Sequence, residues 1–458
     1  MNSAPLPDPA APSGARTTAE SSERVLSNLL RWLERGGAQL SKLQVVRREN
    51  GERDVLARSD IAVGEVVLQV PRALLLTTEV ARHSEIGRRI EDQLHPDNEL
   101  LYLASFLLQE KHRSDSFWKP YLDSLPEAFP HLPRFFHADE LALLQGSQLV
   151  GMLEFQEGVL RREYAQLCEA LPDYTRFAFE EFVWARLSVN SRAFGLDGSM
   201  GGPACVPMAD MLNHRNEPDV RWTNTEDGRF FLMTAQRALS AGEEVFNTYG
   251  LRSNDLSLLH CGFLNDDNSH DAVSLSVGLL PGDALADFKQ QLLSLDSPTG
   301  RHTVHVSRLP GSFAEGSVFA YLRLICASLE DFQVLRRQRT PGPTTRAGEE
   351  RVLRTLAALC EERLAAFPTP LEEDARLLRE APLSPNARAC IRLRHDEKRM
   401  LRDYLELSRT ALGVLGLSRE ELERLVAQSP SPWGWFDIYV RGQLLGMLRG
   451  EGTSVPGT

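Results

Sequence analysis

Polar side chains that could hold a small ligand gather at the ends of two short apolar segments. The first segment, at 204–209, continues into Asp210, Asn213 and His214. The second ends in Tyr249, after an apolar run at 229–235 and a glycine-containing turn at 240–244. Apolar runs separated by such a turn predict a hairpin between the two clusters. Carboxylate, amide, imidazole and phenol groups together could surround a polar molecule and hydrogen-bond to it.

Each of these residues also has an ordinary structural interpretation. Asp210 alone is more often a cap or turn residue, and His214 alone is more often a hydrogen-bonded structural histidine. Tyr249 by itself would most simply pack its ring at the end of a strand. The ordered pair of clusters, followed by Leu251-Arg252-Ser253-Asn254 and His260-Cys261-Gly262-Phe263, is what favours a functional site.

Bulk properties limit the class of protein. A chain of 458 residues is too long for one compact core and predicts two or three domains. The chain has 51 Lys and Arg against 63 Asp and Glu, a net charge of -12, which argues against nucleic acid as a partner. Its six cysteines form no C-x-x-C pair, so we expect no metal site. Neither a signal peptide nor a membrane-spanning run is visible, so we expect a cytoplasmic protein that does not enter the membrane.

The order of elements indicates the fold class. Strand-like segments occur in two blocks, at 40–76 and 204–250, and about a hundred mostly helical residues separate them. A doubly wound sheet would alternate strands with helices, which this chain does not do. We therefore predict an α+β protein with a β-rich core, a helical insertion and a helical C-terminal lobe.

Segment boundaries follow from the same pattern. We expect a disordered, proline-containing tail at 1–22, a helix and the first part of the core at 23–96, a helical insertion at 97–193, the second part of the core at 194–274, and a helical lobe at 275–458.

The chain resembles the SET-domain methyltransferases related to plant Rubisco large-subunit lysine methyltransferase. The motifs that carry the resemblance are Ala57-Arg58-Ser59-Asp60-Ile61, Val70-Pro71-Arg72, Ser116-Phe117-Trp118-Lys119-Pro120-Tyr121-Leu122, Val183-Trp184-Ala185, Ser191-Arg192-Ala193-Phe194 and the two polar clusters. The resemblance extends from about 55 to 275, and a diffuse helical pattern beyond it is similar to the family's substrate-binding lobe. It implies short sheets around a pseudoknot, in which one segment threads beneath another.

The resemblance also implies S-adenosylmethionine (SAM) as the cofactor. Arg192, Asp210, Asn213 and His214 match the family's cofactor-binding positions. Where relatives carry Glu-Gly-x-Gly, this chain has Asn50 followed by Gly51, Glu52 and Arg53. The glycine pattern is shifted, so which of these three residues meets SAM stays open.

Tyr249 matches the family's catalytic tyrosine, and Arg192, Phe194, Cys261 and Phe263 match positions that line the pocket of the methyl acceptor. Lysine-methylating relatives carry an aromatic residue at the position of Phe194, whereas the histidine-methylating branch has an amide that can hydrogen-bond an imidazole. A phenylalanine ring offers an apolar wall and a π face worth about 0.5–2 kcal/mol to an ammonium group. Cys261 stands where lysine-specific relatives often have tyrosine, which leaves the degree of methylation open.

The resulting expectation is a monomeric, SAM-dependent protein-lysine N-methyltransferase. Its partner would be a non-histone protein that carries the target lysine, such as a ribosomal or another basic protein. One alternative is a protein-histidine methyltransferase. The other is a non-catalytic SET-like module that binds a protein.

Overall fold

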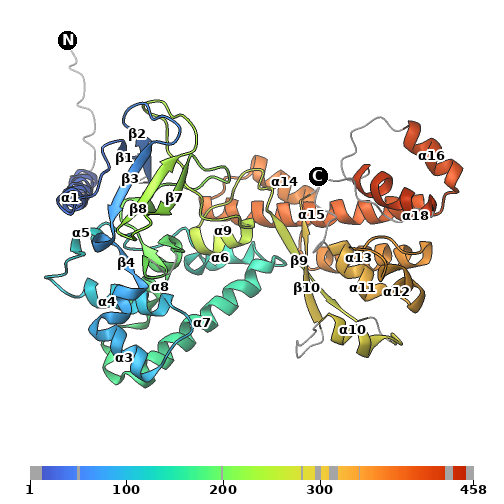
Figure 1. Cartoon of the computed structure of the whole chain (residues 1–458), viewed down its shortest axis with the longest axis horizontal. Helices are drawn as coiled ribbons and strands as arrows, with labels where there is room; N and C mark the ends of the chain where they lie inside the picture. Colours follow the sequence, from blue (N-terminus) through green and yellow to red (C-terminus); the bar gives the residue numbers. More distant parts are fainter. Residues whose placement is uncertain are drawn as a thin grey trace, which may run out of the picture. The chain divides into compact units, whose positions relative to one another are not determined.

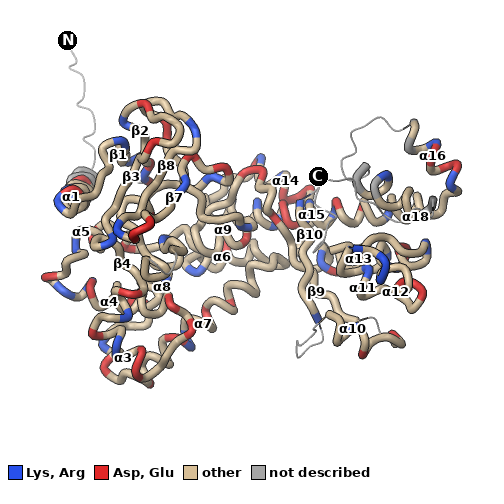
Figure 2. Tube along the Cα trace, in the orientation of Figure 1, with Lys and Arg blue, Asp and Glu red and all other residues tan. Residues whose placement is uncertain are grey.

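The computed structural model describes residues 13–48, 52–196, 200–279, 282–293, 301–308, 318–339, 341–428 and 437–449 (Figure 1). These residues form two compact units. The first unit comprises Met1–Phe129 and Phe155–Leu251, and the second comprises Pro130–Glu154 and Arg252–Thr458. Lys and Arg are interspersed with Asp and Glu along the trace of each unit (Figure 2).

The first unit contains three small antiparallel sheets, with strand orders β1-β2, β3-β8-β7 and β4-β6-β5 (Figure 1). The strands are β1 (Leu43–Arg47), β2 (Arg53–Ala57), β3 (Val66–Pro71), β4 (Leu76–Thr77), β5 (Ala193–Phe194), β6 (Ala204–Cys205), β7 (Val220–Asn224) and β8 (Phe230–Ala235). Alternate residues of β8, namely Phe231, Met233 and Ala235, are buried, which is the pattern of a strand with one face in the core.

The other elements of the first unit are helices. They are α1 (Ser13–Arg35), α2 (Thr78–His83), α3 (Glu85–Gln93), α4 (Leu100–Lys111), α5 (Lys119–Leu122), α8 (Phe179–Arg192) and most of α7 (Gln148–Ala170), with 3₁₀ turns η1 (Arg72–Leu74), η3 (Pro172–Arg176) and η5 (Ala209–Met211). Almost every residue of α4 is buried, and α4 packs on α8. An apolar helix of this kind belongs inside a domain.

The start of α1 corrects one prediction. Residues 13–22 were expected to belong to a disordered tail, but they are the first part of α1, which begins at Ser13. The prolines that argue against a helix end at Pro12, and the Ala, Glu and Arg that follow favour one. The rest of the expected tail, 1–12, lies outside the described residues.

Two segments of the first unit that are distant in the sequence meet through backbone hydrogen bonds. His214 and Asn247 form a parallel bridge, in which Asn247 N donates to Asn213 O and Arg215 N donates to Asn247 O, both at 2.8 Å. Leu56 on β2 forms a further bridge with Glu244. The predicted hairpin had its turn at 240–244, but in the structure the hairpin between the two polar clusters is formed by β7 and β8, which are joined at 225–229, and the turn at 240–244 follows β8.

The second unit is mostly helical around one antiparallel pair, β9 (Ala272–Gly278) with β10 (Arg301–Ser307). Its helices are α6 (Ala138–Ala142), α9 (Asn254–Cys261), α10 (Ala286–Leu292), α11 (Val318–Cys326), α12 (Leu329–Leu335), α13 (Arg346–Ala365), α14 (Leu371–Glu380), α15 (Pro385–Leu415), α16 (Arg419–Gln428) and α18 (Leu445–Arg449), with the 3₁₀ turn η2 (Pro133–Phe135) and the π-helix η6 (Asp437–Leu444). The 31-residue α15 packs on α13, α14 and β9.

The unit boundaries differ from those expected at 97–193 and 194–274. Residues 130–154 of the expected insertion belong to the second unit, and so do 252–274 of the expected core. The reason is packing. Phe136 and Leu144 share a buried cluster with Leu258 on α9 and Leu393 on α15. Glu140 on α6 accepts a hydrogen bond from Ser384 at the start of α15.

None of the helices within the described ranges is long and apolar enough to cross a membrane.

Candidate active site

A buried carboxylate and two guanidinium groups form the centre of the first unit's polar cluster. Asp210 lies on η5, immediately after β6, and its side chain is fully buried. Arg192, the last residue of α8, donates from Nη1 to Asp210 O at 3.1 Å and lies 3.3 Å from Asp210 Oδ2. Helix α8 and η5 thus place an ion pair beside the short strands β5 and β6.

Arg53 on β2 adds a second positive charge to this cluster. Its Nη1 donates to Ser124 O at 3.2 Å. Burial lowers the pKa of Arg53, and the nearby charge of Arg192 lowers it further. No carboxylate in the described part of the chain forms an ion pair with Arg53, so the cluster carries more positive than negative charge.

Tyr121 on α5 completes the cluster. Its hydroxyl donates to Asp210 Oδ2 at 2.8 Å, and the side chain is fully buried. This residue was part of a motif that carried the family resemblance, but no site role was predicted for it. The sequence contains no separate signal for the contact, because 89 positions separate the two partners.

Two buried atoms of this cluster lack a hydrogen-bond partner among the described residues, Arg192 Nε and Asp210 Oδ1. Leaving a buried polar atom unpaired costs about 1–3 kcal/mol. A ligand with both an anionic and a cationic group would satisfy a free guanidinium N–H and a free carboxylate oxygen. The amino-acid end of SAM carries a carboxylate and an ammonium group, so these residues fit it.

The side chain of Asn213 links β2 to Glu244, in the turn at 240–244. Its Nδ2 donates to Glu244 Oε1 at 2.8 Å and to Arg53 O at 3.2 Å, and lies 3.3 Å from Asp54 Oδ1. Glu244 was not predicted as a site residue, although it lies in the turn after the apolar run. Glu52 is exposed and lies 3.9 Å from the guanidinium of Arg48. Gly51 lies outside the described residues.

His214 forms a hydrogen bond with Tyr249, the predicted catalytic residue. Its Nδ1 accepts a hydrogen bond from the backbone N–H of Tyr249 at 2.9 Å, and its Nε2 lies 3.2 Å from Asn216 Oδ1. The acceptor role of Nδ1 places the proton of a neutral ring on Nε2. The Tyr249 hydroxyl donates to Leu212 O at 2.8 Å. Residues 212–214 therefore bind both the backbone N–H and the hydroxyl of Tyr249.

Phe194 on β5 lies in an aromatic group. Its ring makes edge-to-face contacts with Trp222 on β7, at 5.9 Å between centroids, and with Phe231 on β8, at 5.3 Å. Only 9% of Phe194 is exposed. The ring adds apolar surface and no hydrogen-bonding group at the end of α8.

Cys261 and Phe263 belong to the second unit, and both are partly buried. Cys261 ends α9, and Gly262 caps this helix in the left-handed conformation at φ 78°. A Cβ added at Gly262 would lie 2.7 Å from His131 O, so this turn requires glycine.

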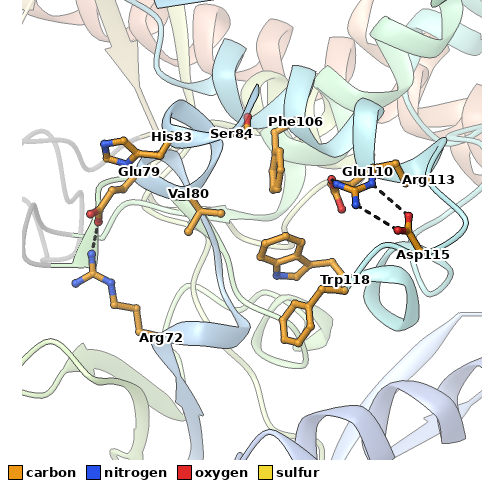
Figure 3. A pocket seen from close by; sticks show the side chains of 11 residues that line it. Arg72, Glu79, Val80, His83, Ser84, Phe106, Glu110, Arg113, Asp115 and Trp118 are labelled. Atoms are coloured by element: carbon orange, nitrogen blue, oxygen red, sulfur yellow. Dashed lines mark hydrogen bonds and ion pairs between the residues drawn. The ribbon is translucent and has the colours of Figure 1, made fainter. Parts of the chain in front are cut away.

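A separate pocket of about 540 Å³ opens in the first unit (Figure 3). Two ion pairs, Arg72–Glu79 and Arg113–Asp115, lie at its sides, and Phe106 and Trp118 lie between them. None of the predicted site residues lines it. The described residues contain no group of three or more His, Cys, Asp or Glu side chains that could hold a metal ion.

Comparison with protein families identifies both parts of the chain. The SET-domain model matches residues 52–250, and the model described as Rubisco LSMT substrate-binding matches residues 280–401. The actin-histidine N-methyltransferase of Plecturocebus moloch is 30% identical over 427 residues, which cover 88% of this chain and 70% of the relative. The chain belongs to the SET-domain protein methyltransferases. As a member, it is a SAM-dependent protein methyltransferase of the Rubisco LSMT-like branch.

Further relatives and a solved structure belong to the same family. The actin-histidine N-methyltransferases of Canis lupus familiaris and Homo sapiens are 31% and 30% identical over 405 residues, covering 83% of this chain and 68% and 67% of the relatives. The SET domain of LSMT bound to lysine and AdoHcy superposes with a TM-score of 0.72 at 23% identity, covering 89% of this chain and 97% of that structure. The structural match confirms the predicted α+β SET fold.

Proposed function

We propose that this enzyme transfers a methyl group from SAM to a histidine side chain of a protein. The observation that carries the proposal is the 30–31% identity to actin-histidine N-methyltransferases over 83–88% of the chain. These comparisons favour histidine, the alternative of the sequence analysis, over the lysine acceptor that was expected first. Because the relatives are named for actin, actin is the first substrate to test.

We assign the amino-acid end of SAM to Arg53, Arg192 and Asp210. Support comes from the excess positive charge of this cluster and from its two unpaired buried atoms. Bound SAM supplies an electrophilic methyl group on a sulfonium. Asn213 and His214 act mainly as positioning residues, because their side chains hold β2 and the backbone of Tyr249.

The transfer itself requires an unprotonated nitrogen in line with the methyl group. The nitrogen lone pair forms the N–C bond while the C–S bond breaks and its electrons stay on sulfur. The Tyr249 hydroxyl, held at Leu212 O, is suited to orient the acceptor and to interact with charge that moves in the transition state. On a histidine acceptor the product is a methylimidazolium cation, and its other ring nitrogen, which still carries a proton, then releases that proton to solvent.

Protonation distinguishes the two acceptors. An imidazole with a pKa of about 6.5 is mostly neutral at pH 7.4, whereas a lysine with a pKa of about 10.4 must lose a proton at a cost of roughly 4 kcal/mol. Desolvation in an apolar pocket would lower that cost for lysine. The pocket therefore has to lower the pKa of a lysine acceptor, whereas a histidine acceptor is already mostly neutral.

Lysine remains the second candidate because of Phe194. Its buried ring, packed against Trp222 and Phe231, can wall an alkyl-ammonium but cannot hydrogen-bond an imidazole. The chemistry of this one position favours lysine, whereas the similarity of the whole chain favours histidine.

One experiment decides between them. The full chain is incubated with isotope-labelled SAM and either actin or a cell extract, and the labelled peptide is mapped by mass spectrometry. Methyl-histidine supports the proposal, and methyl-lysine alone refutes it. If no protein is labelled, titration with SAM shows whether the chain is instead a module without activity, which would give no heat.

A further inference from the structure

Tyr121 donates the shortest hydrogen bond that the Asp210 carboxylate receives. The phenol lies 2.8 Å from Oδ2, and Arg192 Nη1, the other donor to this oxygen, lies at 3.3 Å. The second oxygen, Oδ1, has no partner among the described residues. Tyr121 therefore determines which carboxylate oxygen stays available.

The tyrosine is itself held firmly. The Tyr121 N–H donates to Trp118 O at 2.9 Å, and its carbonyl accepts from Ser124 Oγ at 2.7 Å. The Trp118 ring packs edge-to-face on Phe106 of α4, with 5.2 Å between centroids. Helix α5 thus packs on α4 through Trp118, which limits how far Tyr121 can move.

The hydroxyl also keeps its proton. Burial raises the pKa of Tyr121 well above its ordinary value, and the negative charge of Asp210 raises it further. The group is consequently a permanent donor at neutral pH.

We propose that Tyr121 is a positioning residue for the cofactor. It fixes the Asp210 carboxylate, and through it Arg192, in the orientation that receives the amino-acid end of SAM. The inference rests on the proposed function, because it assumes that this cluster binds SAM. Without the hydroxyl, Oδ2 keeps only the longer contact with Arg192, and the carboxylate can rotate.

The test is Tyr121→Phe in the full chain. Loss of this buried hydrogen bond should raise the KM for SAM about 10-fold and leave kcat within about 2-fold. The Kd of S-adenosylhomocysteine should rise equally. The Kd of 5′-methylthioadenosine, which lacks the amino-acid end, should not change.

Tyr174→Phe is the matched control. Tyr174 is a buried tyrosine of the same unit, and its hydroxyl lies 3.0 Å from Ser105 Oγ. Its removal should affect stability and leave both ligand affinities unchanged. Equal losses for the two ligands, or no loss for either, would overturn the role of Tyr121. So would a Tyr121→Phe chain that fails to fold while Tyr174→Phe folds. A wild-type chain that binds no S-adenosylhomocysteine would overturn the proposed function instead.

Discussion

Tyr249 is held at its backbone by His214 and at its hydroxyl by Leu212 O, so the hydroxyl that we propose to act in the transfer has one defined position. Replacing it by phenylalanine keeps the ring and removes only the donor. We expect Tyr249→Phe to lower kcat by about 10²–10³-fold, the size found for one transition-state donor. SAM affinity, measured by calorimetry, should change by no more than a few-fold.

Tyr164→Phe is a suitable control, because the Tyr164 hydroxyl also donates to a backbone carbonyl, that of Phe177, at 2.7 Å. Its kcat should stay close to that of the wild type. Near-normal turnover in Tyr249→Phe as well would remove Tyr249 from the reaction centre.

Phe194 bears on the choice of acceptor. An asparagine there would provide an amide that can hydrogen-bond an imidazole, and it would remove the π face available to an ammonium. We expect Phe194→Asn to shift the histidine-to-lysine ratio of kcat/KM toward histidine by about 10–100-fold. Peptide pairs that differ only in the target residue measure the ratio. An unchanged ratio would show that position 194 does not contact the acceptor.

At the scale of elements, the turn that ends α9 leaves no room for a side chain at its glycine. Gly262 has φ 78°, and an added Cβ would lie 2.7 Å from His131 O. We expect Gly262→Ala to destabilise the protein by about 1–3 kcal/mol, through strain and steric overlap. Gly151→Ala, at an open position within α7 of the same unit, should instead leave stability unchanged or raise it slightly. Chemical unfolding of both variants measures the difference, and equal stabilities would contradict the geometry of this turn.

The contact between α15 and the start of α7 should depend on pH. Glu397 is buried and accepts a hydrogen bond from Ser147 Oγ at 2.9 Å. Burial raises the pKa of Glu397 to about 8, although Ser147 and Arg363 act in the opposite direction. In the unfolded chain, a glutamate has a pKa of about 4.3. The folded state therefore holds an extra proton between these values, and its stabilising effect is lost as the pH rises through 8.

Glu397→Gln tests this dependence, since glutamine stays neutral and can still accept the bond from Ser147. The wild type should lose about 2 kcal/mol of unfolding free energy relative to the variant between pH 6 and 8. Urea unfolding at the two pH values measures it. A constant difference would mean that Glu397 is ionised throughout this range.

For the whole molecule, the two family matches predict that SAM and the substrate protein bind to different parts of the chain. SAM should protect backbone amides in the SET region, 52–250, and substrate protein should protect amides in 280–401. Ligand stabilises the folded state by RT ln(1 + [L]/Kd), so a hundredfold excess over Kd gives about 2.7 kcal/mol. Hydrogen exchange of the full chain reads out both effects. Protection of 280–401 by SAM alone would contradict the division.

Local sequence patterns were enough to predict the order of the main elements. The two blocks of strands, the turn at 240–244 and the order of Asp210, Asn213, His214 and Tyr249 follow from apolar runs, turn residues and motif spacing along the chain. The family resemblance added the cofactor and the pseudoknotted fold. The helical pattern at 275–458 likewise predicted a lobe, since helical periodicity is a local signal.

Contacts between distant segments could not be predicted in this way. The sequence by itself determined which residue types stand at each strand end, because those depend on near neighbours. Only the tertiary structure decided that Tyr121 reaches Asp210, that Asn213 binds Glu244 and that residues 130–154 join α9 and α15. Such pairings depend on how buried surfaces and buried charges are satisfied in three dimensions, and many sequence separations are compatible with the same local pattern.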